Sequence, residues 1–295
     1  MSFPVKKSYT NTLPHIRMNN LNYIIILVLT LSLVSCNNEK KTKPKTDQTK
    51  LVVSSDLQID HFNIWVTNPK TAKKKLTEIG FTSVPDSLST IHKGQGTTGR
   101  YFYFLNNYLE LIFVYDLTEF EENNRVNRDL DFAERANFAE NEASPFSLAL
   151  KIKDYDIEKI PFKKVKYHQE WMKNSESIYS AVNSKINLKE PSVFAVYPEL
   201  ESDRFETLTD LKSIPEEYAF VRTFYKHPNG AKKVTNIRIT SYDLDMETET
   251  IEAINEIENV SIKNGAEHLM ELTFDNNVQG KIFDLRPELP LIIKI

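Results

Sequence analysis

The sequence IDHFNIWVTNPKTAKKKLTEIGF (59–81), followed by HKGQGTTGRYFYFLNNYLELIFVY (92–115), decides the fold of this chain. Runs of alternating residues that are rich in aromatic and β-branched side chains are typical of strands. The intervening polar run reads as a helix, with a threonine to cap it and a glycine to end it. This block therefore predicts the order βαβββ, with strands at 59–66, 81–84, 100–105 and 108–115, a helix at 72–79 capped by Thr71, and a tight hairpin turn at Asn106 and Asn107.

Two residues able to bind a metal lie in the middle of the first and last of these strands. They are His61 and Glu110. Side chains alternate between the two faces of a strand, so His61 shares a face with Asn63 and Trp65. A histidine and a carboxylate on one face can together hold a divalent metal. The segment therefore predicts a site as well as a fold.

The remaining chain repeats this pattern with little similarity in sequence. Internal repetition of a supersecondary unit is a strong fold signal, because one copy cannot cover its own sheet face. The predicted class is α+β, with repeated βαβββ modules at about 57–116, 145–200 and 228–295.

The first 36 residues do not resemble part of a folded domain. An apolar run at 23–34 follows the positive charges of Lys6, Lys7 and Arg17 and ends in Leu-Val-Ser-Cys. That order resembles the signal peptide and lipobox of bacterial lipoproteins, although a buried apolar segment with a chance cysteine is the alternative. Met18 is an alternative start that would remove the upstream charges.

The resemblance implies cleavage before Cys36 and lipidation of that residue. A signal peptide at 1–35, a lipidated cysteine with a flexible tether at 36–52 and a folded domain at 53–295 follow from it. The first residues of the tether, 37–50, contain no apolar side chain and cannot form a packed core. The predicted location is the bacterial cell envelope, outside the cytoplasm, with the membrane as a partner through the lipid.

Composition excludes several classes of function. The 37 basic and 41 acidic residues give a net charge of −4, which is unlike the basic footprint of a nucleic-acid-binding protein. Cys36 is the only cysteine, so neither an intrachain disulfide nor thiol catalysis is expected. The nucleophile elbow, the phosphate-binding loop and the H-E-x-x-H zinc motif are all missing from the sequence.

Three separated motifs carry a resemblance to a known family. They are Ile59-Asp60-His61, the loop HKGQGT at 92–97 and the strand YLEL at 108–111. In this order and spacing they resemble the glyoxalase-like branch of the vicinal oxygen chelate superfamily. The resemblance covers residues 57–115 well and 145–200 through strand order alone. It implies that paired modules curl into a cup-shaped mixed sheet, with helices on the outside.

The resemblance also implies a divalent metal at the base of the cup, such as Zn, Mn, Fe or Ni. His61 and Glu110 are the implied ligands from the first module. The second module offers Ser147 and the segment 194–197, which are not good ligands. We therefore expect His227 to complete the set, with His92, His268 and Glu271 as further candidates.

The implied activity is that of a lyase, isomerase or dioxygenase acting on a small molecule with adjacent oxygen atoms. His61 and Glu110 are the expected catalytic residues, and Glu110 could act as a ligand or as a base. Two other functions stay open: a metal-free small-molecule-binding lipoprotein and a scaffold lipoprotein without catalysis. The expected substrate-binding residues are His92, Thr97, Arg100 and Trp65, although Arg100 could instead pair with Glu110, and His92 could instead order its own loop.

Overall fold

The computed structural model describes residues 56–197 and 204–295. The predicted signal peptide, Cys36 and the tether lie outside these residues. Ser54–Ile295 form one compact unit. Among the described helices, none combines the length and the apolar character needed to cross a membrane.

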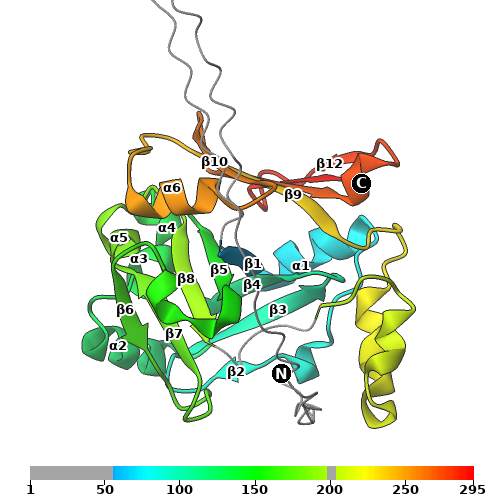
Figure 1. The fold of residues 1–295 in the computed structure, drawn as a ribbon, viewed down its shortest axis with the longest axis horizontal. Coiled ribbons are helices and arrows are strands. Elements are labelled where there is room, and N and C mark those ends of the chain that lie inside the picture. The colour runs from blue at the N-terminus through cyan, green and yellow to red at the C-terminus, as the bar shows by residue number, and fades with distance from the viewer. Residues whose placement is uncertain (1–55, 198–203) are drawn as a thin grey trace, which may run out of the picture. The chain divides into compact units, whose positions relative to one another are not determined.

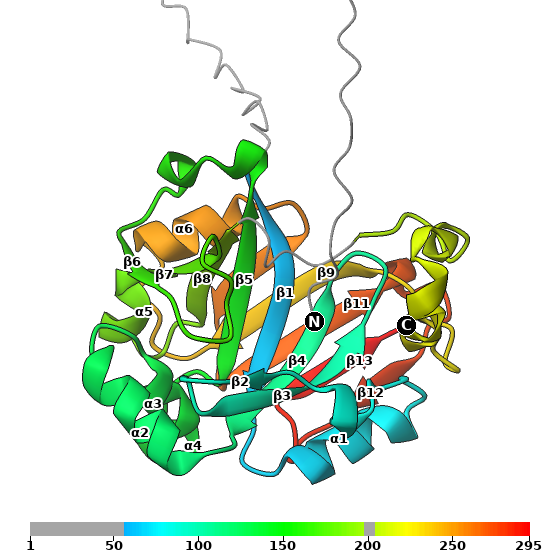
Figure 2. The same cartoon turned by 90° about the horizontal axis from the view of Figure 1, so that it is seen from below.

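The larger of two sheets has eight strands in the order β2-β3-β4-β1-β5-β8-β7-β6 and is curled (Figure 2). Its strands are β1 (Leu57–Trp65), β2 (Ile91–His92), β3 (Thr97–Tyr103), β4 (Tyr108–Val114), β5 (Phe146–Ile152), β6 (Lys164–Tyr167), β7 (Ser177–Ala181) and β8 (Ser192–Tyr197).

This sheet consists of two modules related by their strand pairing. In each module the first strand runs parallel to the last, as β1 does to β4 and β5 to β8. The two first strands, β1 and β5, meet antiparallel at the centre. The predicted class, α+β with repeated modules in a curled mixed sheet, is confirmed.

The third module, which we also call the third unit, keeps a similar order of elements but forms a separate sheet. Its order is β10-β9-β11-β13-β12, so the first strand, β9, lies between its parallel neighbour β10 and its antiparallel neighbour β11. Pattern alone does not distinguish this pairing from that of the first two modules. The strands are β9 (Val234–Ser241), β10 (Val260–Asn264), β11 (Leu269–Phe274), β12 (Ile282–Asp284) and β13 (Leu291–Lys294).

One apolar cluster joins the two sheets. It contains Phe62 and Leu111 from the first sheet and Ile239 and Leu272 from the second, each fully buried. In Figure 1 the second sheet lies above the first, with α6 (Glu249–Asn255) at one side and α1 (Pro69–Glu78) near the other. Burying each such side chain contributes roughly 1.5–3 kcal/mol, so this layer dominates the stability of the fold.

The other helices pack elsewhere. Helices α2 (Leu117–Val126), α3 (Phe132–Ala136) and α4 (Phe138–Asn141) lie together at one corner of the first sheet in Figure 2. Trp65 packs against Phe120 of α2 and Phe132 of α3, so these helices cover one end of the sheet face opposite the main core. The short helix α5 is Val182–Ile186, and the 3-10 helices are η1 (Asp86–Leu88), η2 (Lys153–Tyr155), η3 (Ile157–Lys159), η4 (Asp210–Ser213), η5 (Glu216–Tyr225) and η6 (Asp275–Asn277).

Three local predictions are corrected. Helix α1 begins earlier than expected, because Asn68 caps it by accepting from the Thr71 N–H and Pro69 occupies its first turn. No strand forms at 81–84. The β3–β4 turn spans residues 104–107 rather than two asparagines, since Tyr103 pairs with Tyr108 and the side chain of Asn106 bonds to the backbone of Val234.

Candidate functional site

A row of polar side chains crosses the centre of the first sheet on the face that carries His61. In-register partners on adjacent strands share a face, so the pairing defines this row. We call this face, which also carries His61 and Trp65, the cup face. Read from β3 to β8, the row is Tyr101, Glu110, Asn63, Ser147 and Ser192, all of them buried.

Glu110 is the charged group at the centre of this arrangement. Its side chain is buried and its Oε1 accepts a hydrogen bond of 3.1 Å from the Tyr101 hydroxyl. Desolvation raises the pKa of this carboxyl, while His61 and the Tyr101 bond oppose the rise. Among the described residues, no lysine or arginine forms an ion pair with it. A buried carboxyl without a cation is costly, which marks a functional position.

Arg100 does not neutralise Glu110. It pairs with Leu111 across the β3–β4 ladder and therefore lies on the opposite face. There its guanidinium contacts Asp86 at 3.1 Å and stacks on Phe113. Arg100 was expected to bind substrate, but strand alternation directs its side chain away from the face that carries Glu110.

His92 joins Glu110 through Tyr101. Its Nε2 lies 3.2 Å from the Tyr101 hydroxyl and 3.8 Å from Glu110 Oε1, and its Nδ1 lies 2.9 Å from the Thr97 hydroxyl. Burial lowers the pKa of His92 to about 3, so the ring is neutral at physiological pH. A neutral ring has one donor and one acceptor nitrogen. The structure therefore places the predicted residues His92 and Thr97 in one hydrogen-bonded chain with Glu110.

The hydrogen bonds of this chain can point in either direction. When Glu110 is ionised, Thr97 donates to His92, His92 donates to Tyr101 and Tyr101 donates to Glu110. When Glu110 is protonated, it donates to Tyr101 and Tyr101 donates to His92. Both arrangements use the same contacts, so the network holds Glu110 in place in either protonation state.

His61 belongs to a second, adjacent pair. A β-bulge between Ile59 and His61 inserts Asp60 as an extra residue. The Nδ1 of His61 lies 2.7 Å from Asp60 Oδ2, and Lys151 lies 3.7 Å from the other carboxylate oxygen of Asp60. Asp60 thus sets the tautomer of His61 and leaves Nε2 directed elsewhere. The ring stacks on Tyr108, with centroids 4.3 Å apart.

His227 takes no part in either group. Its Nδ1 accepts from the Thr82 N–H at 3.0 Å and its Nε2 lies 3.0 Å from the Tyr103 carbonyl. Both ring nitrogens are thus engaged by backbone, and burial lowers the pKa to about 4. His227 was expected as a metal ligand, but in this structure backbone groups occupy both nitrogens of its ring.

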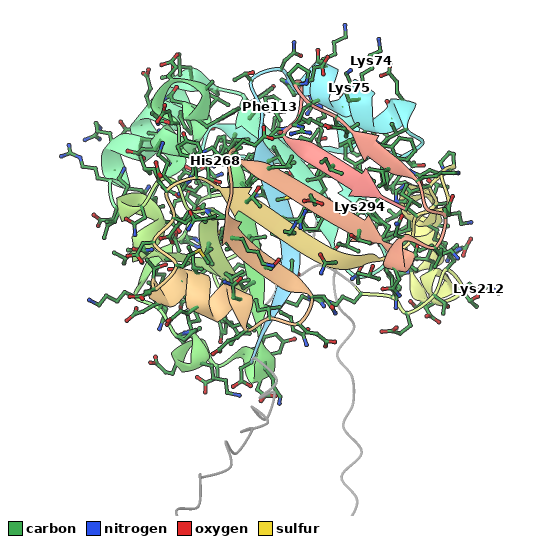
Figure 3. All side chains as sticks on the ribbon, turned by 90° about the horizontal axis from the view of Figure 1, so that it is seen from above. Lys74, Lys75, Phe113, Lys212, His268 and Lys294 are labelled. Carbon is green, nitrogen blue, oxygen red and sulfur yellow. The ribbon has the colours of Figure 1, made fainter. Side chains whose placement is uncertain are left out.

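The further candidates lie on the third unit. Figure 3 shows Lys294 on the face of the second sheet. Its ammonium group lies 2.5 Å from the Glu271 carboxylate, which also pairs with Arg238. His268 contacts Ser241 and the Glu142 carbonyl. These groups form ion pairs and hydrogen bonds of their own, away from the cup face.

The donor set on the cup face does not fit a resident metal. Across the described residues, no three His, Cys, Asp or Glu side chains are grouped so that they could hold one. Glu110 accepts a hydrogen bond from Tyr101 and lies near His92. The second module places Ala149 and Phe194 beside His61. Apolar side chains therefore stand where the implied ligands of the second module would be.

Sequence reasoning missed three residues of the site: Tyr101, Asp60 as an orienting group, and Gly99. A signal for Tyr101 was present, since RYFYFL alternates and a four-residue turn brings Tyr101 opposite Glu110. Gly99 lies under Glu110: a Cβ there would be only 2.7 Å from its Cγ and 2.9 Å from its Cδ. Trp65, expected to bind substrate, is buried in the helix-covered apolar end of the cup face.

Comparisons with known proteins leave the family open. No protein family model and no curated protein matches the chain. One similar solved structure is described as the crystal structure of a hypothetical protein from Staphylococcus aureus. It aligns with 80% of this chain and 98% of its own length, at 13% identity and a TM-score of 0.48.

Proposed function

We propose that the cup face binds a small oxygen-bearing molecule and that Glu110 exchanges a proton with it. The observation that carries this proposal is the chain Thr97–His92–Tyr101–Glu110, which ends on a buried carboxyl without a lysine or arginine partner among the described residues. A carboxyl with a raised pKa is suited to general acid–base catalysis near neutral pH. The three motifs that resemble glyoxalase-like proteins support the same function.

In the proposed reaction, the Glu110 carboxylate removes a proton from a carbon next to a carbonyl group. The C–H electron pair becomes an enolate, and the proton rests on Glu110 until it returns to carbon or passes to another atom. Tyr101 and His92 are neutral donors that stabilise the carboxylate between turnovers. This sequence needs no oxidant or reductant.

A proton–deuterium exchange assay tests the proposal. The full-length protein is incubated in D₂O with dihydroxyacetone or hydroxyacetone, and loss of the C–H signal is followed by proton NMR. We expect wild-type exchange above the buffer rate and a loss of roughly 10²–10⁴-fold in Glu110→Gln, as for other general bases. Arg100→Gln, which alters the opposite face, is the control and should retain the exchange. Equal rates in wild type and Glu110→Gln would refute the role of Glu110.

A metal-free binding protein of the same fold is the second candidate. It is favoured by Ala149 and Phe194, which stand beside His61 where ligands were expected. A binder would show ligand-dependent thermal stabilisation in wild type and in Glu110→Gln, without exchange in either. Metal content before and after loading with Zn²⁺, Mn²⁺, Fe²⁺ or Ni²⁺, with His61→Ala beside it, tests the divalent metal that the resemblance implies.

We also propose that lipid on Cys36 anchors the chain in the bacterial cell envelope. The support is the order of charges, apolar run and Leu-Val-Ser-Cys in the sequence. Replacement of Cys36 by serine should move the protein from the membrane fraction to the soluble fraction. A membrane-bound Cys36→Ser protein would contradict lipidation at this residue.

A further inference from the structure

The Asn63 side chain carries an unexplained acceptor on the cup face. Its Oδ1 is inaccessible to solvent and has no hydrogen-bond partner among the described residues. Asn63 is 5% exposed and lies in register with Glu110 on one side and Ser147 on the other. A buried carbonyl without a donor is unfavourable, so each such atom in a native protein calls for an explanation.

A second unpaired atom lies at the edge of the same cluster. The Trp171 ring packs 4.9 Å from the ring of His92, and its Nε1 is also buried without an acceptor among the described residues. Through His92 and Tyr101, Trp171 adjoins Glu110. One unpaired acceptor and one unpaired donor therefore flank the proposed catalytic group. A hydroxyl group both donates and accepts hydrogen bonds, so a ligand hydroxyl can pair with either of these atoms.

The surroundings select for an uncharged ligand. Lys151 is close to Asp60, which leaves no uncommitted cation in this group to bind an anion. Glu110 already accepts from the Tyr101 hydroxyl and lies 3.8 Å from His92, so it is committed within the site. Next to the polar row runs an aromatic row of Tyr103, Tyr108, His61 and Phe194. Aromatic faces beside amide and hydroxyl groups suit the apolar and polar sides of a sugar.

We propose that Asn63 is a ligand-binding residue that accepts a hydrogen bond from a hydroxyl group of a neutral sugar or polyol on the cup face. This inference rests on the proposed function, because the same face holds Glu110. It adds a chemical class, a neutral polyhydroxy compound, and a residue that distinguishes it from anions and from apolar molecules.

Binding is tested on the full-length protein with D-ribose, D-xylose and myo-inositol, and with succinate as an anionic comparison. The readout is the fluorescence of the two tryptophans, Trp65 and Trp171, the second of which adjoins His92. We expect a saturable change with at least one neutral probe and none with succinate. The absence of a change with all three neutral probes would overturn the proposal.

Asn63→Leu removes the unpaired carbonyl at nearly constant volume. We expect it to weaken sugar binding at least about ten-fold, since a group that pairs with a polar ligand has been lost. Because the unmet acceptor also disappears, the midpoint of thermal unfolding should rise by about 2–4 °C. Unchanged binding in this variant would overturn the proposal, and so would a lower midpoint, which would indicate that a structural water already satisfies Asn63.

Two further variants keep the test specific. Asn63→Asp retains an acceptor of the same shape and should retain sugar binding. Asn107→Leu makes the same substitution at another buried asparagine whose Oδ1 lacks a described partner, in the turn between β3 and β4, and should leave binding unchanged. Loss of binding in Asn63→Asp or in Asn107→Leu would count against Asn63 as the acceptor. Glu110→Gln should lose proton exchange but keep sugar binding, so the two proposals can fail separately.

Discussion

Gly99 shows how one residue positions the proposed catalytic group. The Glu110 side chain lies across the space that a side chain at position 99 would occupy. Because the backbone of Gly99 is ordinary extended strand, the requirement is for space and not for an unusual conformation. The chain thus gives up a side chain in β3 so that the carboxyl can reach Tyr101.

Replacing Gly99 by alanine should displace the carboxyl from Tyr101. Forcing a methyl group into a packed site costs about 1–3 kcal/mol, and proton exchange should fall as the hydrogen bond is lost. Combining Gly99→Ala with Tyr101→Phe tests the cause, since both changes break the same contact and their effects on exchange should not add. Additive effects would show that Gly99 acts by another route.

At the residue scale, the family motifs supplied positions that the fold brings onto one face. His61, His92, Thr97 and Glu110 all lie on the cup face. Prediction from the sequence failed where the strand register decides on which face of the sheet a side chain lies. Arg100 and Tyr101 are neighbours, yet only Tyr101 faces Glu110. The register follows the 104–107 turn, which is fixed by contacts with residues more than 120 positions away. Local sequence does not contain that information.

At the scale of elements, one buried arginine links α3 to several segments of the first sheet. Arg135 is fully buried and its guanidinium donates to Asp131 at 2.7 Å. It also donates to the backbone carbonyls at the start of β5, in α5 and in the loop before β8, namely Ser144, Ser184, Leu188 and Glu190. One side chain therefore satisfies the ends of several elements that sequence patterns predict separately or not at all.

Replacing Arg135 by methionine should destabilise the protein severely. It leaves Asp131 buried without its cation and removes one donor from each of four carbonyls, and breaking a buried pair in this way costs about 3–5 kcal/mol. Urea unfolding measures the loss. Arg125→Ala is the matched control, because its pair with Glu122 is largely exposed and should contribute at most about 1 kcal/mol. Similar losses in both variants would contradict the anchoring role of Arg135.

The sequence pattern does not predict short elements of mixed composition. The strand β6 reads KVKY, in which two lysines and an exposed edge position hide the alternation. Long strands were recognised, because their burial on at least one face imposes a regular apolar pattern. Edge elements face water and leave no such pattern.

At the scale of the whole folded domain, Glu190 connects the first sheet to the third module, which forms the second sheet. Its carboxyl is buried and accepts from Asn183 at 2.7 Å and from Asn187 at 3.2 Å, with Thr248 at the start of α6 as a further donor. None of these partners carries a charge. Desolvation, opposed by these hydrogen bonds and by Arg135, raises the pKa of Glu190 to about 7.

The raised pKa makes the stability of the unit depend on pH. The folded state holds the Glu190 proton more tightly than the unfolded chain, in which the glutamate pKa is near its ordinary value of 4.5. The resulting stability is therefore fully present below about pH 4.5, and it is lost as pH rises through about 7. Glu190→Gln keeps the shape without the charge. It should differ little from wild type at pH 5 compared with pH 8, where it should be more stable than wild type by roughly 1–3 kcal/mol.

Thermal and urea unfolding at both pH values measure this difference. Glu170→Gln, at an exposed position paired with Lys93, should leave the pH profile unchanged. An identical pH dependence in wild type and Glu190→Gln would mean that the carboxyl is already ionised in the folded protein.

Because Glu190 faces α6, the same titration should loosen the contact between the first sheet and the third unit. Hydrogen exchange at the start of α6 should therefore increase between pH 5 and pH 8 in wild type, after correction for intrinsic exchange, and not in Glu190→Gln.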